Sequence, residues 1–199
     1  KQRVMLARAL CQQPDILVLD EPTSFLDIRY KLEFLSIIQE MARNDRLTVI
    51  LSLHELDLAE RISDKVLCVR GDRIDRFGTP EEIFCGDYIS ELYGMTVGHY
   101  DAGTGELELQ PVSGAPKVFV IAGGGRGKAV FRRLQRQGIP FAAGILWEND
   151  MDYPAAKALA VRTVAVHIFS DVDAEHIEMA KGLIDSCENV LTVFDRTEW

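Results

Sequence analysis

The sequence has no long hydrophobic run and no excess of positive charge. None of its 199 residues belongs to an apolar stretch of about 18 or more, the length that a membrane-spanning helix requires. Lysine and arginine number 22 against 31 aspartates and glutamates, so the net charge of −9 argues against a nucleic-acid-binding surface. The hydrophobic content of 47% is sufficient for one or two domains with real cores.

The cysteines and histidines lack the spacing of a metal site. Cys11, Cys68, Cys85 and Cys187 include no Cys-x-x-Cys pair, and the four histidines show no ligand spacing. Three of the cysteines fall in apolar patterns. We therefore expect buried, reduced thiols in a cytosolic protein.

One apolar stretch ends in two carboxylates. Residues 16–19 read as a buried strand, Asp20 and Glu21 follow, and Pro22 stops the strand. A buried carboxylate pair is costly without a cation nearby, and open α/β sheets bind ligands at the carboxyl ends of their strands. The pattern indicates a magnesium–nucleotide site in which Asp20 holds the metal and Glu21 activates water. The alternative is a strand that ends in a solvated acidic turn.

A second apolar run, residues 47–53, brings His54 to its C-terminal end. A histidine there is placed to donate a hydrogen bond to a terminal phosphate. This second polar residue at a strand end favours the nucleotide site over the acidic turn.

Four motifs follow one another in residues 1–54: KQRVMLARAL at 1–10, DILVLDE at 15–21, SFLD at 24–27, and His54. They resemble the helix after the signature motif, the Walker B strand, the D-loop and the switch histidine of an ABC transporter ATP-binding subunit. The resemblance covers the C-terminal part of such a subunit and continues, less well defined, to about residue 94.

The resemblance implies ATP and Mg2+ as cofactors and a role for each matching residue. Asp20 would bind Mg2+, Glu21 would be the catalytic carboxylate, and His54 would contact the terminal phosphate. Ser24 and Asp27 would lie at the ATP site and the dimer interface, while Asp27 also caps the next helix. Two subunits would form a homodimer that drives integral-membrane permease subunits from the cytoplasmic, inner face of the membrane.

Several parts of that family's site do not occur in this sequence. No Gly-x-x-x-x-Gly-Lys-Ser/Thr loop (Walker A) precedes the Asp-Glu strand, and Lys1 opens inside an amphipathic helical pattern without a cap. We expect the sequence to be part of a longer protein and to be inactive alone. Central strands would then be missing, so we expect residues 1–100 to expose apolar surface and to rearrange, self-associate or order poorly.

The end of the first region predicts a capped helix and narrows the resemblance. Thr79 with Glu82, and Pro80 at the first helical position, are typical of a helix N-terminus. The segments GTPEEIF at 78–84 and LYG at 92–94 resemble the tail of importers for iron-siderophores and cobalamin. The resemblance thus implies an importer for an iron-siderophore, haem or cobalamin.

The whole chain predicts an α/β fold in two domains. Residues 1–97 would be the C-terminal part of an ABC ATPase, a partial P-loop NTPase domain. Residues 98–116, rich in glycine and proline, would form a linker with a small hairpin around residues 102–105. Residues 117–199 alternate strands and helices, which predicts a small Rossmann-like accessory domain with a parallel sheet and right-handed crossovers.

The accessory domain contains a glycine loop that fits neither common phosphate motif. Ala122 and Ala129 break a Walker A pattern, and Lys128 occupies the third glycine of a dinucleotide-binding pattern.

The loop still suggests a ligand by its physical character. Glycines allow a ligand to approach the backbone, and the following helix presents free N–H groups at its positive end. We hypothesise a small anionic ligand, sensed by this domain, at Gly123, Gly125, Arg126, Gly127 and Lys128. The alternative is a tight strand–helix turn that requires glycine only for its backbone.

An acidic cluster follows the next strand of that domain. Glu148, Asn149, Asp150 and Asp152 either line the same crevice or form a solvated loop in which Asp152 caps the helix that begins at Tyr153.

Two other functions stay open at this point. One is a soluble ABC ATPase of translation or DNA repair, against which the importer-like tail and the acidic composition argue. The other is a regulatory module that senses a small ligand through residues 117–199.

Overall fold

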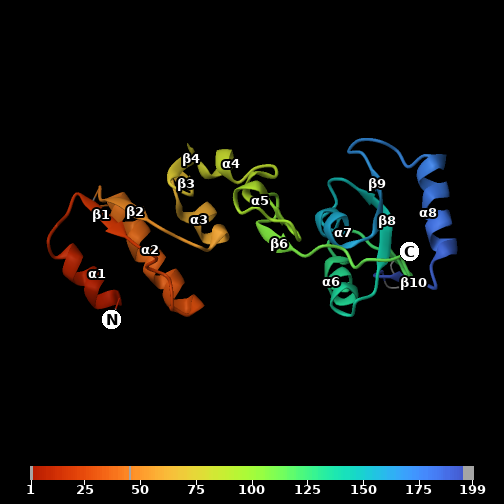
Figure 1. Cartoon of the computed structure of the whole chain (residues 1–199), viewed down its shortest axis with the longest axis horizontal. Coiled ribbons are helices and arrows are strands. Elements are labelled where there is room, and N and C mark those ends of the chain that lie inside the picture. Colours follow the sequence, from red (N-terminus) through yellow and green to blue (C-terminus); the bar gives the residue numbers. More distant parts are fainter. Residues whose placement is uncertain (1, 45, 195–199) are drawn as a thin grey trace. The chain divides into compact units, whose positions relative to one another are not determined.

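The structure, a computed structural model, describes residues 2–44 and 46–194. Lys1, which the first motif includes, lies outside the described residues, as do the last five residues of the predicted accessory domain. Contacts divide the chain into two units, Lys1–Tyr88 and Ile89–Trp199, and each unit is described by itself (Figure 1). The fold is mixed α/β, as predicted.

The first unit contains helices and strands in the predicted order. They are α1 (Gln2–Leu10), β1 (Ile16–Leu19), α2 (Ile28–Asn44), β2 (Thr48–Leu51), α3 (Leu56–Ile62), β3 (Val66–Arg70), β4 (Arg73–Gly78) and α4 (Pro80–Ile83).

Strands β1 and β2 form a parallel pair, with Leu19 opposite Leu51, so their carboxyl ends lie side by side. Helix α2 packs on one face of the pair because its apolar positions recur at helical spacing. The buried core comprises Leu6, Leu17, Phe34, Leu35, Ile38 and Leu47.

The opposite face of the pair is uncovered. Ile16, Val18 and Ile50 are 58%, 69% and 56% exposed, whereas Leu17, which points the other way, is 5% exposed. The expected apolar surface is therefore present. Self-association through it stays a prediction.

Strands β3 and β4 form an antiparallel hairpin, and α4 follows it. The Glu82 carboxylate accepts a hydrogen bond from the Thr79 N–H at 2.7 Å, and Pro80 begins the helix, as the sequence predicted.

The second unit contains a short hairpin and a parallel sheet. Its elements are α5 (Tyr88–Leu92, which begins at the boundary), β5 (His99–Asp101), β6 (Glu106–Glu108), β7 (Val118–Ile121), α6 (Lys128–Arg136), β8 (Phe141–Trp147), α7 (Tyr153–Leu159), β9 (Arg162–Val166), α8 (Ala174–Ser186) and β10 (Asn189–Thr192).

The four-stranded sheet has the order β10-β7-β8-β9, and every neighbouring pair is parallel. The chain moves from β7 to β8 and β9 on one side and then returns to add β10 on the other. The order therefore reverses between β7 and β10, which is the point where open α/β sheets bind ligands. The Rossmann-like prediction is confirmed at the level of a small parallel α/β sheet.

Helices cover both faces of this sheet (Figure 1). Val118, Val120 and Phe141 face α6 and α7, in a cluster where Phe131 stacks on Phe141. Phe119 and Val164 pack with Ala180 of α8 on the other face. The alternation of neighbouring strand residues between two cores explains why the strands read as continuous apolar runs.

The hairpin of β5 and β6 forms where the sequence placed it, and it belongs to the second unit. Arg132 of α6 binds Glu106 and Glu108 of β6. Contacts thus divide the chain at residues 88 and 89, ahead of the predicted linker at 98–116. That residues 1–97 and 117–199 fold as independent domains stays a prediction.

All four cysteines are free, but only Cys68 is buried and Cys187 half-buried. The expectation of burial is wrong for Cys11 and Cys85, which lie just after α1 and α4 at the surface.

None of the helices in the described parts of the chain has the length and apolar character that crossing a membrane requires.

Candidate functional site

The carboxyl ends of β1 and β2 bring Asp20 together with Ser52. The Ser52 hydroxyl donates to Asp20 Oδ1 at 2.8 Å and accepts from the Glu21 N–H at 2.8 Å. The parallel register makes this possible because Leu19 and Leu51 pair as the last residues of the two strands, so that Asp20 and Ser52 follow side by side. One hydroxyl therefore orients both the candidate metal ligand and the backbone of the candidate catalytic residue.

Glu21 and His54 meet at the same edge. His54 Nε2 lies 2.6 Å from Glu21 Oε1, although 33 residues separate them in sequence. Glu21 has a positive φ of 44°, a left-handed backbone conformation that few residues other than glycine adopt. Both side chains are open to solvent, 47% exposed for Glu21 and 72% for His54.

The contact shifts both pKa values in the directions that favour an ion pair. The hydrogen bond from His54, followed by that from Ser24, lowers the pKa of Glu21 below its usual 4.5. The same hydrogen bond, followed by the charge of Glu21, raises the pKa of His54 above its usual 6.5. At neutral pH Glu21 is thus an ionised carboxylate and His54 is biased toward the doubly protonated, donating form.

The two D-loop residues take different positions. Ser24 Oγ donates to the second carboxylate oxygen of Glu21 at 3.1 Å. Asp27 Oδ1 accepts from the Tyr30 N–H at 3.0 Å and so caps α2, which agrees with its expected local role. Between them, Phe25 is fully exposed and also has a positive φ.

The residues around Asp20 fit a magnesium ion better than a zinc ion. Carboxylate and hydroxyl oxygens are hard ligands, and Mg2+ keeps several water or phosphate ligands besides one or two carboxylates. No cluster of three or more His, Cys, Asp or Glu residues able to hold a metal occurs in residues 2–44 and 46–194. Binding of Mg2+ at Asp20, together with the phosphates of a nucleotide, stays a prediction.

Four contacting residues were not predicted: Ser52, Thr23, Lys31 and Glu55. Ser52 precedes His54 by two, and residues two apart in an extended segment point the same way, so a signal for it existed. Thr23 Oγ1 donates to Glu55 Oε2 at 3.1 Å, and Lys31 Nζ binds Glu55 Oε1. These contacts join segments 24 and 32 residues apart, for which the local sequence carries no signal.

The glycine loop of the second unit is bound by carboxylates of its own chain. The Gly124 N–H donates to Asp150 Oδ2 at 3.0 Å, and the N–H groups of Gly127 and Lys128 donate to Asp152 at 2.8 and 3.0 Å. Of the amides that were expected to receive an anionic ligand, those of Gly127 and Lys128 are therefore occupied. Binding through Gly123, Gly125, Arg126, Gly127 and Lys128 stays a prediction, and a ligand would have to compete with both aspartates.

Asp152 corrects a prediction about helix capping. It precedes α7, but its side chain makes no cap hydrogen bond there and binds the first turn of α6 instead. The expected solvated loop is also wrong for this residue, since Asp152 is fully buried. Gly127 is required because a Cβ there would lie 2.6 Å from Ala122 Cβ and 2.7 Å from the Phe131 ring.

The positive charge near the loop is also paired. Lys128 Nζ binds Glu106 of the hairpin, and Arg132 Nη2 lies 2.8 Å from the same carboxylate. Hydrogen bonding and charge from Lys128 and Arg132 lower the pKa of Glu106.

Comparison with known proteins gives relatives of one kind. An uncharacterized ABC transporter ATP-binding protein, MJ0873 of Methanocaldococcus jannaschii, is 36% identical over 148 residues, which are 73% of this chain and 51% of that protein. The cobalamin import ATP-binding protein BtuD of Halobacterium salinarum is 30% identical over 87% of this chain and 45% of its own length. The hemin import ATP-binding protein HmuV of Thermobifida fusca is 37% identical over 61% of this chain and 39% of its own length.

The chain is a homologue of ABC transporter ATP-binding proteins. It spans about half the length of these two ABC transporter relatives, 51% of MJ0873 and 45% of BtuD. The match to BtuD is long enough that it must extend from the first unit well into the second. In addition, the model of the MJ0874 family matches residues 141–194, from β8 to β10 of the second unit.

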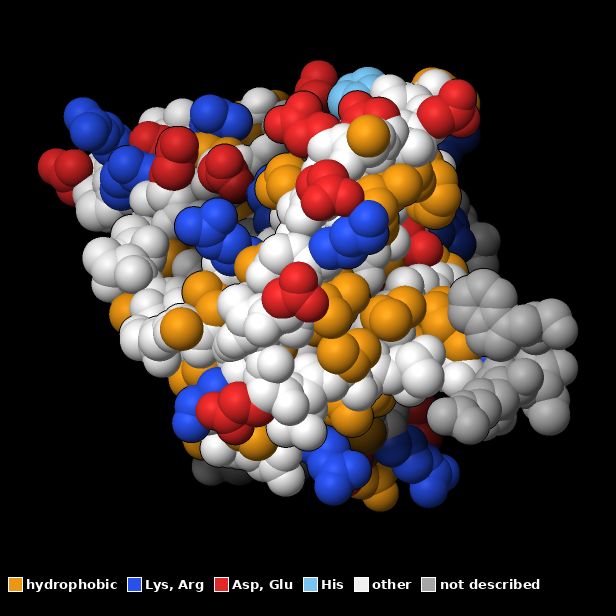
Figure 2. Space-filling view, turned by 90° about the vertical axis from the view of Figure 1, so that its right-hand side faces the viewer, with side chains coloured by type: hydrophobic (Ala, Val, Ile, Leu, Met, Phe, Trp, Pro, Cys, Tyr) orange, Lys and Arg blue, Asp and Glu red, His pale blue; other side chains and the backbone are white. Residues whose placement is uncertain are grey.

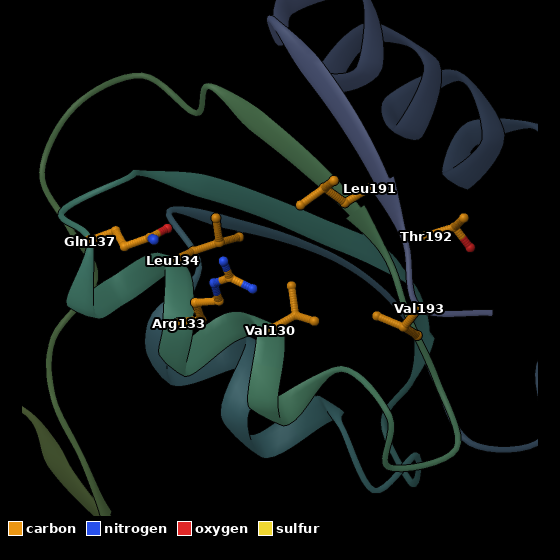
Figure 3. Close-up of a pocket in the computed structure, with 7 residues that line it drawn as sticks. All are labelled: Val130, Arg133, Leu134, Gln137, Leu191, Thr192 and Val193. Atoms are coloured by element: carbon orange, nitrogen blue, oxygen red, sulfur yellow. The ribbon is translucent and has the colours of Figure 1, made fainter. Parts of the chain in front are cut away.

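This ABC homologue also has an open groove in its second unit. Figure 3 shows α6 and β10 facing each other across it, with Val130, Leu134, Leu191 and Val193 projecting from the two sides. Arg133, Gln137 and Thr192 complete the lining.

The surface that faces the viewer in Figure 2 carries charged side chains of both signs as well as hydrophobic ones. Acidic and basic side chains are interspersed, and hydrophobic side chains gather between them. Exposed apolar residues of α8 and β10 include Ile177, Met179, Val190 and Leu191.

Proposed function

We propose that the first unit is half of an ATPase site, and that in the full-length protein it hydrolyses ATP to drive import across a membrane. The observation that carries this proposal is the Glu21–His54 contact at 2.6 Å, made at the carboxyl ends of two adjacent parallel strands. An acidic turn without function would have no need to bring a histidine from the next strand to its carboxylate.

Each residue has a role that its environment supports. Asp20, oriented by Ser52, holds Mg2+, which when bound neutralises charge on the phosphates. Glu21 is held as an ionised carboxylate by hydrogen bonds from His54 and Ser24, and it takes a proton from the attacking water as general base. His54 has a raised pKa and donates to the terminal phosphate.

The proposed assembly is a homodimer of ATP-binding subunits bound to integral-membrane permease subunits at the cytoplasmic face. Ser24, which binds Glu21, and Asp27, which caps α2, lie in the segment between β1 and α2 and are the proposed contacts across the dimer. The exposed Phe25 between them is consistent with an interface at this turn.

The proposed cargo is cobalamin, haem or an iron-siderophore. Support comes from the resemblance of the tail after β4 and from relatives named for cobalamin and hemin import. The relative named for cobalamin import aligns over the largest part of this chain among those compared above, which favours that class.

The 199-residue chain by itself is proposed to be inactive. Its sequence contains no Walker A loop, so Asp20 and Glu21 would have no held triphosphate on which to act. Purified chain should hydrolyse ATP no faster than its Glu21→Gln variant.

The deciding experiment uses a longer form of the protein that contains a Walker A loop. Glu21→Gln should still bind ATP but hydrolyse it at least about 100-fold more slowly, because the general base is lost. Near-normal turnover by this variant would refute the assignment.

A second measurement separates import from a soluble ABC ATPase. An importer subunit should co-purify with a polytopic membrane protein, whereas a soluble ATPase of translation or repair should not. A ligand-sensing role for residues 117–199 is compatible with either result.

A further inference from the structure

Glu55, the residue after His54, is held from two directions. Its Oε2 accepts from Thr23 Oγ1 at 3.1 Å, and its Oε1 binds Lys31 Nζ. Thr23 belongs to the turn after β1, Lys31 to the first turn of α2, and Glu55 to the start of α3. One carboxylate thus links three segments of the first unit.

The bridge is more protected than the site beside it. Thr23 is 1% exposed, and the side chains of Lys31 and Glu55 are 22% and 29% exposed. Hydrogen bonding from Lys31, opposed in part by burial and aided by Thr23, lowers the pKa of Glu55. Glu55 is therefore ionised, and both its oxygens are engaged.

The neighbouring contact between Glu21 and His54 is weak compared with this bridge. Glu21 and His54 are largely exposed, and exposed ion pairs contribute little to fixing a geometry. Thr23 lies two residues after Glu21, and Glu55 lies one residue after His54. The Thr23–Glu55–Lys31 bridge therefore ties the segment that carries Glu21 to the segment that carries His54.

We propose that Glu55 is a positioning residue that holds His54 against Glu21 through Thr23 and Lys31. The proposal rests on the proposed function, in which Glu21 and His54 act on ATP. Glu55 itself contacts neither of them through a hydrogen bond in the structure, so its effect on the reaction is transmitted by His54.

The test uses NMR of the 199-residue chain, with the His54 ring signals assigned by their loss in His54→Ala. In the parent, Glu21→Gln should shift these signals because it removes the charged partner. In a Glu55→Gln chain, the shift caused by Glu21→Gln should fall to less than about half, since residues that act through one another are not additive.

Two further variants keep the test decisive. Lys31→Met removes the other end of the bridge and should weaken the response in the same way, even if Glu55→Gln does not fold. Glu33→Gln is the matched control, because Glu33 pairs with Arg29 on the exposed side of the same helix. A full response of His54 in both bridge variants would overturn the proposal.

A kinetic readout in the full-length protein separates positioning from mere stability. Glu55→Gln should lower kcat about tenfold with little change in the KM for Mg-ATP, and it should cause no further loss in a His54→Ala background. An equal loss in both backgrounds would show a purely structural role. If the parent hydrolyses no ATP, the proposed function fails, and the NMR experiment still decides whether Glu55 positions His54.

Discussion

The Asp152 carboxylate lies 2.8 Å from the N–H of Gly127, a residue 25 positions earlier. Its other oxygen accepts from the Lys128 N–H, so an aspartate at the entrance of α7 caps the first turn of α6. Free N–H groups at a helix start require an acceptor, and here a fully buried side chain from the next crossover supplies it.

Loss of this cap should destabilise the second unit. Asp152→Ala leaves two amides without acceptors and should lower the free energy of unfolding by about 2 kcal/mol. Urea denaturation followed by tryptophan fluorescence measures this, because both tryptophans belong to the second unit. Asp171→Ala, an exposed aspartate of the loop before α8, is the control and should change the stability by less than about 0.5 kcal/mol.

The Glu21–His54 pair should respond to pH from both sides. Because the pKa of His54 is raised, the stability that protonated His54 contributes is fully present below about pH 6.5. It is lost as the pH rises through the raised pKa of the folded protein. Because the pKa of Glu21 is lowered, the stability that ionised Glu21 contributes is fully present above about pH 4.5. It is lost as the pH falls through the lowered pKa of the folded protein. An NMR titration should find the pKa of His54 above its ordinary value in the parent chain and closer to that value in the Glu21→Gln variant.

The elements that carry the first unit could be predicted because their signals are local. The apolar run at 16–19 gives β1 with its observed bounds, and Asp27 caps the following helix, α2, as predicted. Strand β2 is shorter than predicted, Thr48–Leu51 instead of 47–53, because apolar residues continue past the last pairing with β1.

The contacts that complete the sites could not be predicted in the same way. Asp152 has the sequence context of a cap for α7, and only the return of the chain beside the glycine loop gives it another helix to bind. The Thr23–Glu55–Lys31 bridge likewise depends on how α2 and α3 meet the turn after β1. Such pairings are properties of the assembled fold.

The anionic-ligand hypothesis for the glycine loop makes a sharp prediction. A ligand at these amides must displace Asp150 from Gly124, so Asp150→Asn should strengthen binding of inorganic phosphate or a nucleotide about tenfold. Isothermal titration of the 199-residue chain measures this, with Asp171→Asn as control. Absence of binding in both the parent and Asp150→Asn would exclude the loop as an anion site.

The hairpin of β5 and β6 should depend on one side chain of α6. Arg132 Nε donates to Glu108 Oε1 at 3.1 Å, and Glu108 is only 8% exposed. Arg132→Met would leave that buried carboxylate without its cation, which is costly, so the hairpin should detach before the sheet unfolds. Amide hydrogen exchange in residues 99–108 should accelerate at least about tenfold, a change of about 1.4 kcal/mol in local stability. Arg136→Met, on the exposed side of the same helix, should leave these exchange rates unchanged, and equal acceleration by both variants would show that the ion pair does not anchor the hairpin.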